Sequence, residues 1–205
     1  MAEAADLGLL EDPPIRIAYE AVAWGNHIDT WQGSWEIVQR VNRPNLGLCL
    51  DTFHIAGRVW ADPAARSGRN TDADKKLAES LAQLVREVDI KKVFYLQVAD
   101  GERLERPLDE SHPFYKPNQR ARMSWSRNAR VFPFEEDRGG YLPVMDVARA
   151  LVHGLGYRGW VSMEVFSAGL AETRPSVPVE FARRAAISYA RLEEELGFGQ
   201  ERSGL

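Results

Sequence analysis

Four short apolar runs along the chain each end in a polar residue that can bind an ion, and the runs are 15–20, 46–51, 93–97 and 160–164. Their length and their content of β-branched and aromatic residues are typical of buried parallel strands. The residues at the four ends are Glu20, Asp51, Gln97 and Glu164. The pattern therefore predicts four strands with one polar side chain at each carboxyl end.

Segments with helical periodicity alternate with these runs. Apolar residues recur three or four positions apart in four such segments: from Trp31 after a cap at Asp29 or Thr30, from near Thr71 to Val88, from about Pro143 to His153, and from about Pro178 to Leu196. Gly154 and Gly197 follow the last two segments and are typical helix stops. The alternation predicts a parallel α/β fold of the TIM-barrel type, with about four βα units.

The segment 100–142 differs from the rest of the chain, because it lacks sustained periodicity and is rich in Pro, Arg and aromatic residues. A long insertion without regular structure is uncommon unless it forms a functional loop or lid. In a (β/α)8 barrel it would lie at the carboxyl ends of the strands, where active sites are built. We therefore expect a single partial barrel domain, 1–205, with a long active-site loop at 100–142.

The chain is short for this fold. A complete barrel needs about 250 residues and eight strands, whereas the pattern predicts four strands in 205 residues. Residues 1–10 resemble the end of a preceding βα unit, so we expect the C-terminal half of a barrel. A truncated chain is favoured over an unusual half-barrel that assembles with a partner. Exposed sheet edges favour association, so the expected partners are a second copy or an N-terminal half-barrel complement.

Composition narrows the function classes. The net charge of −4 and the 44% hydrophobic content are ordinary for a globular protein and give no basic surface for nucleic acid. The single cysteine, Cys49, excludes an intrachain disulfide and a thiolate metal cluster, and we expect it to be a small buried residue. No stretch approaches the ~20 apolar residues of a membrane span and the N-terminus lacks a secretory pattern, so we expect a cytoplasmic protein without a membrane partner.

The four strand-end residues form a candidate metal site, because side chains at the carboxyl ends of barrel strands converge on one cavity. Glu20, Asp51 and Glu164 would repel one another there, and a divalent cation relieves that repulsion. Carboxylate oxygens and the amide oxygen of Gln97 are hard ligands, which favours Mg²⁺, Mn²⁺ or a similar ion such as Co²⁺. The alternative is that each residue only pairs with nearby backbone groups or an arginine.

Two histidines follow the candidate ligands. His54 lies three residues after Asp51, and the ordinary pKa of histidine, near neutrality, suits a general acid or base. The alternative for His54 is a structural hydrogen bond in a loop. His27 lies beyond the first strand and can line the same opening at the carboxyl ends of the strands.

Four arginines in the segment 100–142 surround the sequence Met-Ser-Trp-Ser: Arg120, Arg122, Arg127 and Arg130. A basic, aromatic-bearing loop over an anionic metal site suits a small substrate with a carboxylate, because arginine binds carboxylates through paired hydrogen bonds. The alternative is a solvated charge run that pairs with the acidic residues 135–137.

Five segments of the chain resemble the 3-dehydroshikimate dehydratases, and the fungal-type members in particular. They are 19–25 (YEAVAWG), 47–58 (GLCLDTFHIAGR), 122–130 (RMSWSRNAR), 136–144 (EDRGGYLPV) and 159–166 (GWVSMEVF). These enzymes belong to the sugar phosphate isomerase/epimerase superfamily, which has the xylose-isomerase-like barrel. The resemblance runs from about Ile15 to Leu192 and covers only the C-terminal half of the family barrel.

The resemblance implies a function and a set of site residues. It matches the four strand-end residues to divalent-metal ligands and His54 to a catalytic histidine. The implied reaction is the dehydration of the small molecule 3-dehydroshikimate to protocatechuate, in quinate and shikimate catabolism. We expect the substrate to be bound by Arg122, Ser124, Arg127 and His27, with the two arginines as carboxylate clamps.

Three alternatives stay open. A sugar or sugar phosphate isomerase or epimerase of the same superfamily would use the same metal with two acid–base groups. A metal endonuclease of this superfamily would need a richer set of ligands than a chain with four histidines and no basic face offers. A non-catalytic half-barrel fragment that dimerises would carry out no reaction at all.

Overall fold

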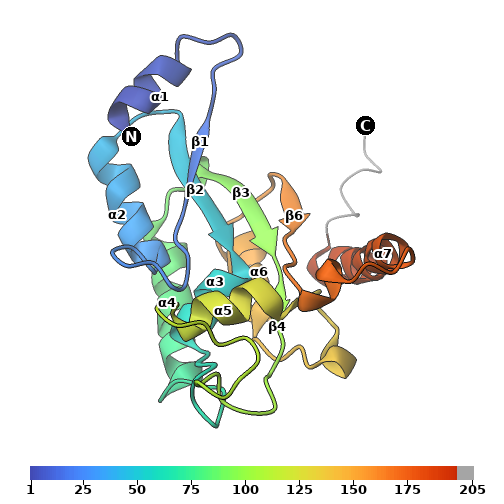
Figure 1. The fold of residues 1–205 in the computed structure, drawn as a ribbon. Coiled ribbons are helices and arrows are strands. Elements are labelled where there is room, and N and C mark those ends of the chain that lie inside the picture. The colour runs from blue at the N-terminus through green and yellow to red at the C-terminus, as the bar shows by residue number, and fades with distance from the viewer. Residues whose placement is uncertain (198–205) are drawn as a thin grey trace.

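The computed structural model describes residues 1–197 and contains a four-stranded parallel sheet (Figure 1). Its strands are β1 (Ile17–Glu20), β2 (Leu46–Asp51), β3 (Val93–Val98) and β6 (Val161–Met163). They lie in the order β1-β2-β3-β6, and all three pairings are parallel. The predicted α/β fold with four parallel strands, as in part of a barrel, is confirmed.

The central strand β2 has all six residues buried, and its side chains alternate between two faces. Leu50 belongs to the hydrophobic core, whereas Cys49 and Asp51 point to the opposite face. The register places Glu20 beside Cys49 and Gln97 beside Asp51. We call the face that carries these four polar side chains the inner face of the sheet.

Four helices lie after the strands, at the positions that the periodicity predicts. They are α2 (Trp31–Val41), α4 (Ala73–Glu87), α6 (Val144–Arg149), which continues into a π-helical turn (Ala150–Gly154), and α7 (Val177–Leu196). Thr30 caps α2, because its side chain accepts a hydrogen bond from the Gly33 backbone N–H. The chain also forms α1 (Ala2–Gly8) and two 3-10 turns, η1 (Ile90–Lys92) and η4 (Ala168–Ala171).

The expectation that 100–142 lacks regular structure is wrong. This segment contains β4 (Asp100–Gly101), α5 (Ala121–Asn128), β5 (Arg130–Val131) and the 3-10 turn η2 (Glu136–Arg138), and β4 pairs with β5 in an antiparallel ladder. These elements are too short to show a period in the sequence. They are held by tertiary contacts, above all those of the buried Trp125, whose ring lies 4.6 Å from the ring of Phe53.

The close packing of α5 depends on Gly101 in β4. A Cβ atom at this position would lie 2.4 Å from the Trp125 ring, closer than any side chain tolerates. The indole N–H of Trp125 then donates to the backbone oxygen of Glu102 at 2.8 Å. Figure 1 shows the result: α5 lies just beyond the carboxyl ends of β2 and β3, next to α3 (Thr52–Val59).

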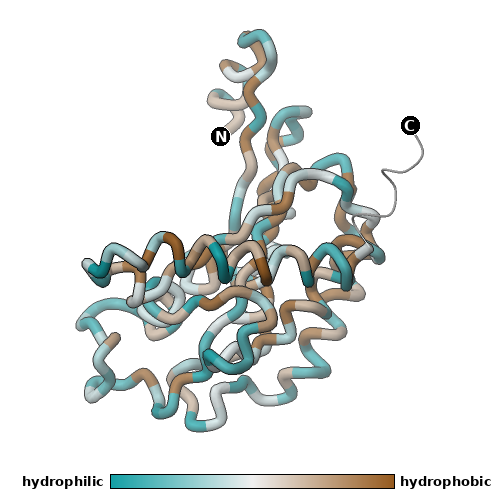
Figure 2. The backbone as a smooth tube through the Cα atoms, turned by 90° about the vertical axis from the view of Figure 1, so that its right-hand side faces the viewer, coloured by the Kyte–Doolittle hydropathy of each residue, from teal (hydrophilic) through white to brown (hydrophobic). Residues whose placement is uncertain are grey.

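Both edges of the sheet are open in the described residues, because β1 pairs only with β2 and β6 pairs only with β3. Large apolar side chains near these edges are exposed, and Trp160, just before β6, is 81% exposed. The N-terminal segment with α1 projects from the body of the molecule (Figure 2). Among the helices of residues 1–197, none has the length and apolar character required to cross a bilayer.

Candidate metal centre

Asp51 lies at the junction of β2 and α3, and its two carboxylate oxygens have different partners. Oδ1 accepts hydrogen bonds from the backbone N–H groups of Phe53 at 2.6 Å and His54 at 3.3 Å, which caps α3. Oδ2 accepts from Nη1 of Arg130 at 2.8 Å. The cap explains why a helix starts directly after the strand and why His54 is on its first turn, and not in a loop.

Glu20 and His54 face each other across the end of β1. Nε2 of His54 lies 3.4 Å from Oε1 of Glu20 and 3.8 Å from Oδ2 of Asp51. Nδ1 of His54 points the other way, toward the backbone N–H of Ala23 at 3.3 Å, and the Trp24 ring stands edge-on to the imidazole at 4.8 Å. Oε1 of Glu20 is buried and has no hydrogen-bond partner among residues 1–197, which is costly unless a ligand binds to this oxygen.

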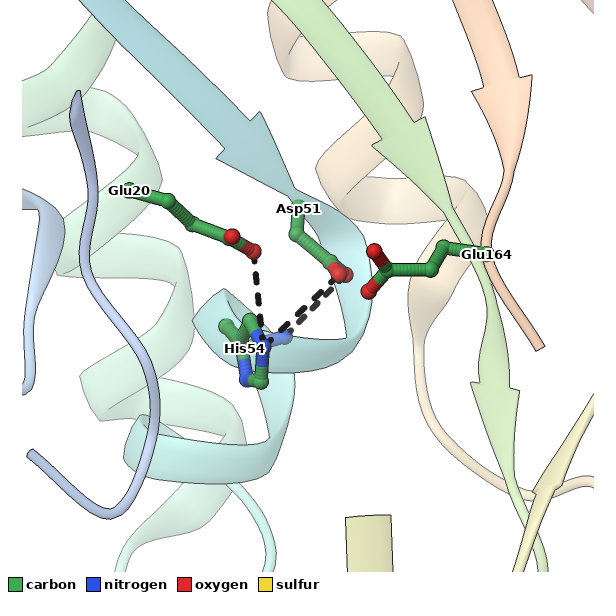
Figure 3. A group of neighbouring side chains, drawn as sticks. All are labelled: Glu20, Asp51, His54 and Glu164. Atoms are coloured by element: carbon green, nitrogen blue, oxygen red, sulfur yellow. Dashed lines mark hydrogen bonds and ion pairs between the residues drawn. The ribbon is translucent and has the colours of Figure 1, made fainter. Parts of the chain in front are cut away.

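Glu164 follows β6 directly and completes the group. Its Oε1 accepts from Nε2 of Gln97 at 2.7 Å, and its Oε2 accepts from Nη1 of Arg130 at 3.1 Å. One ligand atom from each of Glu20, Asp51, His54 and Glu164 lies within 4.8 Å of the others. Figure 3 shows the three carboxylates converging above His54 from the ends of three strands. The structure thus brings together three of the predicted ligands and His54, and Gln97 joins them through Glu164.

Arg130 is the residue of this centre that the sequence prediction did not place there. Its guanidinium is 1% exposed, and besides the two carboxylates it contacts Nε2 of His54 at 2.8 Å and Oγ of Ser126 at 3.0 Å. The sequence does hold a hint, since Arg130 lies within the apolar run Ala-Arg-Val-Phe. A charged residue in such a run is normally buried against an opposite charge.

The pKa values of the carboxyl groups reflect crowding in a buried space. Burial, and then the neighbouring Asp51 and Glu164 carboxylates, raises the pKa of Glu20 to about 8. Burial also raises the pKa of Glu164, against the opposing effect of Arg130. Burial lowers the pKa of His54 to about 4, although the nearby Asp51 acts in the opposite direction. When all three carboxylates are ionised, Arg130 leaves two negative charges, which a divalent cation would neutralise.

The donor set fits a hard divalent cation. Carboxylate oxygens, with the imidazole nitrogen of His54 nearby, are ligands that Mg²⁺, Mn²⁺ and similar ions accept, whereas the amide of Gln97 turns its NH₂ group toward Glu164 and its oxygen toward Cys49. The unpartnered Oε1 of Glu20 lies where such an ion would be bound. The structure therefore contains a candidate metal centre, and the ion that it prefers is not fixed by these residues.

The other predicted site residues lie apart from this cluster. Arg122 donates from Nε to the backbone oxygen of Gly57 at 2.9 Å and from Nη2 to that of Ala61 at 2.7 Å, so its guanidinium fastens α5 to the end of α3. Ser124 is buried and accepts from the side chain of Gln119. Arg127 and His27 are both exposed. The contacts of Arg122 are those of a structural clamp, in place of the carboxylate clamp expected from the sequence.

Relatives of known name resemble most of the chain. It is 53% identical over 196 residues to a protein of Neurospora crassa named 3-dehydroshikimate dehydratase, an alignment that covers 96% of this chain and 55% of the relative. It is 34% identical over 157 residues to a Pseudomonas aeruginosa protein of the same name, covering 76% of this chain and 18% of the relative. The chain therefore spans about half the length of the fungal relative.

Solved structures share the fold. A xylose isomerase-like TIM barrel/4-hydroxyphenylpyruvate dioxygenase fusion protein superposes with a TM-score of 0.63 at 27% identity, over 100% of this chain and 26% of the other. The IOLI protein, whose structure has a bound zinc atom, superposes with a TM-score of 0.56 at 24% identity, over 95% of this chain and 53% of the other. The family described as xylose isomerase-like TIM barrel matches residues 1–191. The chain belongs to that family.

Proposed function

We propose that this chain carries the metal-binding half of a lyase that converts 3-dehydroshikimate into protocatechuate, in quinate and shikimate catabolism. The observation that carries the proposal is the convergence of Glu20, Asp51, His54 and Glu164 within 4.8 Å. The name shared by the fungal and bacterial relatives supports the choice of substrate. Mg²⁺, Mn²⁺ or Co²⁺ is the proposed cofactor, held by these carboxylates and by Gln97.

The reaction removes one water from the ring. A proton leaves the carbon next to the substrate ketone, the neighbouring C–O bond breaks, and the hydroxyl departs with a proton as water. The remaining ketone then becomes a phenol as the ring turns aromatic. A divalent cation, when bound, stabilises the negative charge that develops on the ketone oxygen.

His54 is the residue proposed to move the proton. Its Nε2 is the ring atom that faces the carboxylates, while Nδ1 is turned toward the backbone of Ala23. The buried edge contact with Trp24 holds the ring in this orientation. One imidazole in this position can take the proton from carbon and deliver it to the departing hydroxyl.

Positive charge for an acidic substrate is proposed to come from two places. Arg130 supplies it inside the cluster, where it already pairs with Asp51 and Glu164. Arg127 and His27 are exposed and are proposed to bind the substrate carboxylate when the substrate enters. Ser124, which is buried, is proposed to support α5. Arg122 is proposed to contribute to this site indirectly, through its hydrogen bonds to backbone oxygens at the end of α3.

We further propose that a second βα segment completes the substrate pocket. The open edges of β1 and β6 and the half-length match to the fungal relative both support this. The inner face is only partly covered, since Gln97 and Glu164 are half-buried. The part of the fungal relative that this chain does not match is proposed to supply further parallel strands with covering helices, which would close the sheet into a barrel.

The test is an assay of the purified chain with 3-dehydroshikimate and Mn²⁺, Co²⁺ or Mg²⁺, with protocatechuate followed by its absorbance. The assay is run on the chain alone and on the chain co-expressed with the N-terminal part of the fungal relative. Because the proposed pocket needs the second segment, we expect metal-dependent product from the complex, lost in Glu20→Gln, and little or none from the chain alone. No product from that complex would contradict the dehydratase proposal, and turnover of ketose substrates would favour the isomerase or epimerase alternative.

A further inference from the structure

The loop between β1 and α2, residues 21–30, lies against His54. The backbone N–H of Ala23 donates to Nδ1 of the imidazole at 3.3 Å, and the centroid of the Trp24 ring is 4.8 Å from that of the imidazole, edge-on. In Figure 3 the chain beyond β1 passes His54 on the side away from Glu164. The loop therefore contacts the part of the imidazole that does not face the carboxylates.

A tight turn at the centre of this loop requires glycine. The N–H of Gly25 donates to the backbone oxygen of Val22 at 2.8 Å, and a Cβ atom at position 25 would lie 1.9 Å from the backbone oxygen of Ile28. No side chain fits so close to a backbone atom, so only glycine leaves the space that this turn needs. Ala23 and Trp24 lie within the turn, and its shape determines how they meet His54.

Two arginines from different parts of the chain hold the loop from outside. Nε of Arg58, in the last turn of α3, donates to Oδ2 of Asp29 at 2.6 Å. This contact ties the end of the loop to the helix that also carries His54. Nη1 of Arg120, the residue before α5, donates to the backbone oxygen of Gly25 at 2.9 Å, across 95 positions of the sequence. This second contact ties the centre of the loop to the segment 100–142.

We propose that Arg120 is a positioning residue that holds the loop 21–30 closed against His54, and we call its contact with Gly25 the latch. The proposal rests on the proposed function only in assigning the proton transfer to His54. Arg120 is exposed, and a hydrogen bond of this kind shifts an equilibrium by about 2–10-fold. The latch thus favours the closed loop and still lets it open, which suits a site that has to admit a substrate.

The test compares Arg120→Met, which removes the donor and keeps an unbranched side chain, with Arg120→Lys, which keeps the charge and a donor. Backbone amide exchange in the metal-free chain, followed by NMR, reports how often the loop opens at Ala23. We expect exchange at Ala23 to be about 2–10 times faster in Arg120→Met and close to the wild-type rate in Arg120→Lys. Equal rates in wild type and Arg120→Met would overturn the proposal.

The second readout is the reactivity of His54 itself. Its side chain is 4% exposed, so diethyl pyrocarbonate reaches the imidazole mainly when the loop opens, and mass spectrometry locates the modified histidines. We expect His54 to react about 2–10 times faster in Arg120→Met than in wild type. His153, exposed in the π-helical turn after α6, is the internal control and should react at one rate in all variants. An unchanged rate at His54 would contradict the latch.

Controls separate the latch from a general loss of stability. Lys116→Met removes one positive charge from an exposed position of the same segment and should leave the exchange at Ala23 unchanged. The amides of β2 and β3 should exchange equally in wild type and Arg120→Met. If they become faster by the same factor as Ala23, Arg120 only stabilises the fold and the proposal is wrong.

The two proposals fail separately. Neither amide exchange nor the modification of His54 needs metal or substrate, so an inactive complex would contradict the dehydratase proposal without changing the expected rates in Arg120→Met. We also expect Arg120→Met to change Mn²⁺ affinity less than twofold, on the usual scale of independent sites, because the latch lies on the side of His54 away from the carboxylates. A tenfold loss of Mn²⁺ affinity would show that Arg120 acts on the metal centre and would overturn the latch.

Discussion

Two carboxylates of the candidate metal centre differ in what they do without a cation. Oδ2 of Asp51 pairs with the buried Arg130 and Oδ1 caps α3, whereas Oε1 of Glu20 has no hydrogen-bond partner. The burial and charges around Glu20 raise its pKa to about 8. In the chain without metal, the carboxylate of Asp51 therefore has a structural role, whereas the proposed role of Glu20 is that of a metal ligand.

Glu20→Gln should separate metal binding from stability. We expect it to weaken Mn²⁺ binding at least tenfold, because a neutral amide replaces a charged ligand. The metal-free free energy of unfolding should stay the same or rise slightly, since burial and the repulsion from Asp51 and Glu164 outweigh the attraction to Arg130. Calorimetry and urea denaturation measure the two quantities, and a large loss of metal-free stability would contradict this account of Glu20.

Asp51→Asn should damage both properties. The amide cannot accept from Arg130 as the carboxylate does. Arg130 keeps its ion pair with Glu164, so the loss of the Asp51 partner costs about 1–3 kcal/mol. We expect a drop of this order in the metal-free free energy of unfolding, together with weaker Mn²⁺ binding. Urea denaturation beside Glu20→Gln gives the comparison, and equal stabilities of the two variants would show that the Arg130 pair contributes little.

At the scale of elements, α5 is fixed to α3 by Arg122. Its guanidinium donates to the backbone oxygens of Gly57, in the last turn of α3, and of Ala61, just beyond that helix. We expect Arg122→Met to lower the free energy of unfolding by about 1–3 kcal/mol, since the Gly57 carbonyl loses its side-chain donor, whereas Ala61 still accepts from Asn70. Mn²⁺ affinity should change little. Arg127→Met, at an exposed position of the same helix, is the control and should be neutral in both measurements.

A second element-scale prediction concerns the ends of the β4–β5 ladder. Asp100 is buried and its Oδ1 accepts from the backbone N–H groups of Gly101, Tyr141 and Leu142. Burial raises its pKa from 3.8 to about 7, against these hydrogen bonds and with a smaller contribution from Glu136. The folded protein thus holds a proton that the unfolded chain releases above its ordinary pKa.

The free energy of unfolding should therefore fall as the pH rises from about 4 to about 7, the range in which Asp100 titrates, and should stay constant at higher pH. Asp100→Asn cannot titrate, so its stability relative to wild type should increase by about 2–3 kcal/mol between about pH 5 and about pH 8. Urea denaturation at both pH values measures this. Asp109→Asn is the control, because the lowered pKa of the exposed Asp109 puts its titration below this window. A parallel pH dependence in wild type and Asp100→Asn would contradict the prediction.

What the sequence predicted well are the elements with a long or repeated pattern. The four strands and the helices α2, α4 and α7 all follow from periods of apolar residues. The rule that parallel strands end on one side was enough to group Glu20, Asp51 and Glu164. The sequence did not predict contacts that are made across the fold. Whether Arg122 or Arg130 enters the cluster depends on how α5 packs over Gly101, and the local sequence does not encode this packing.

At the scale of the whole molecule, the apolar surface next to β6 has no partner in the described residues. Trp160, which directly precedes the unpaired edge strand β6, is 81% exposed. Exposed apolar patches and free strand edges promote association. We therefore expect the isolated chain to self-associate as its concentration rises, and to do so through this edge.

Sedimentation analysis over a range of concentrations measures that association. The variant Trp160→Glu should shift the chain toward monomer, because charge on this surface opposes burial. Leu10→Glu is the matched control, since Leu10 is 80% exposed but lies in the projecting N-terminal segment. Co-expression with the N-terminal part of the fungal relative should likewise suppress self-association, as the added strands would occupy the same edge. A wild-type chain that stays monomeric at every concentration without that segment would contradict an open half-barrel.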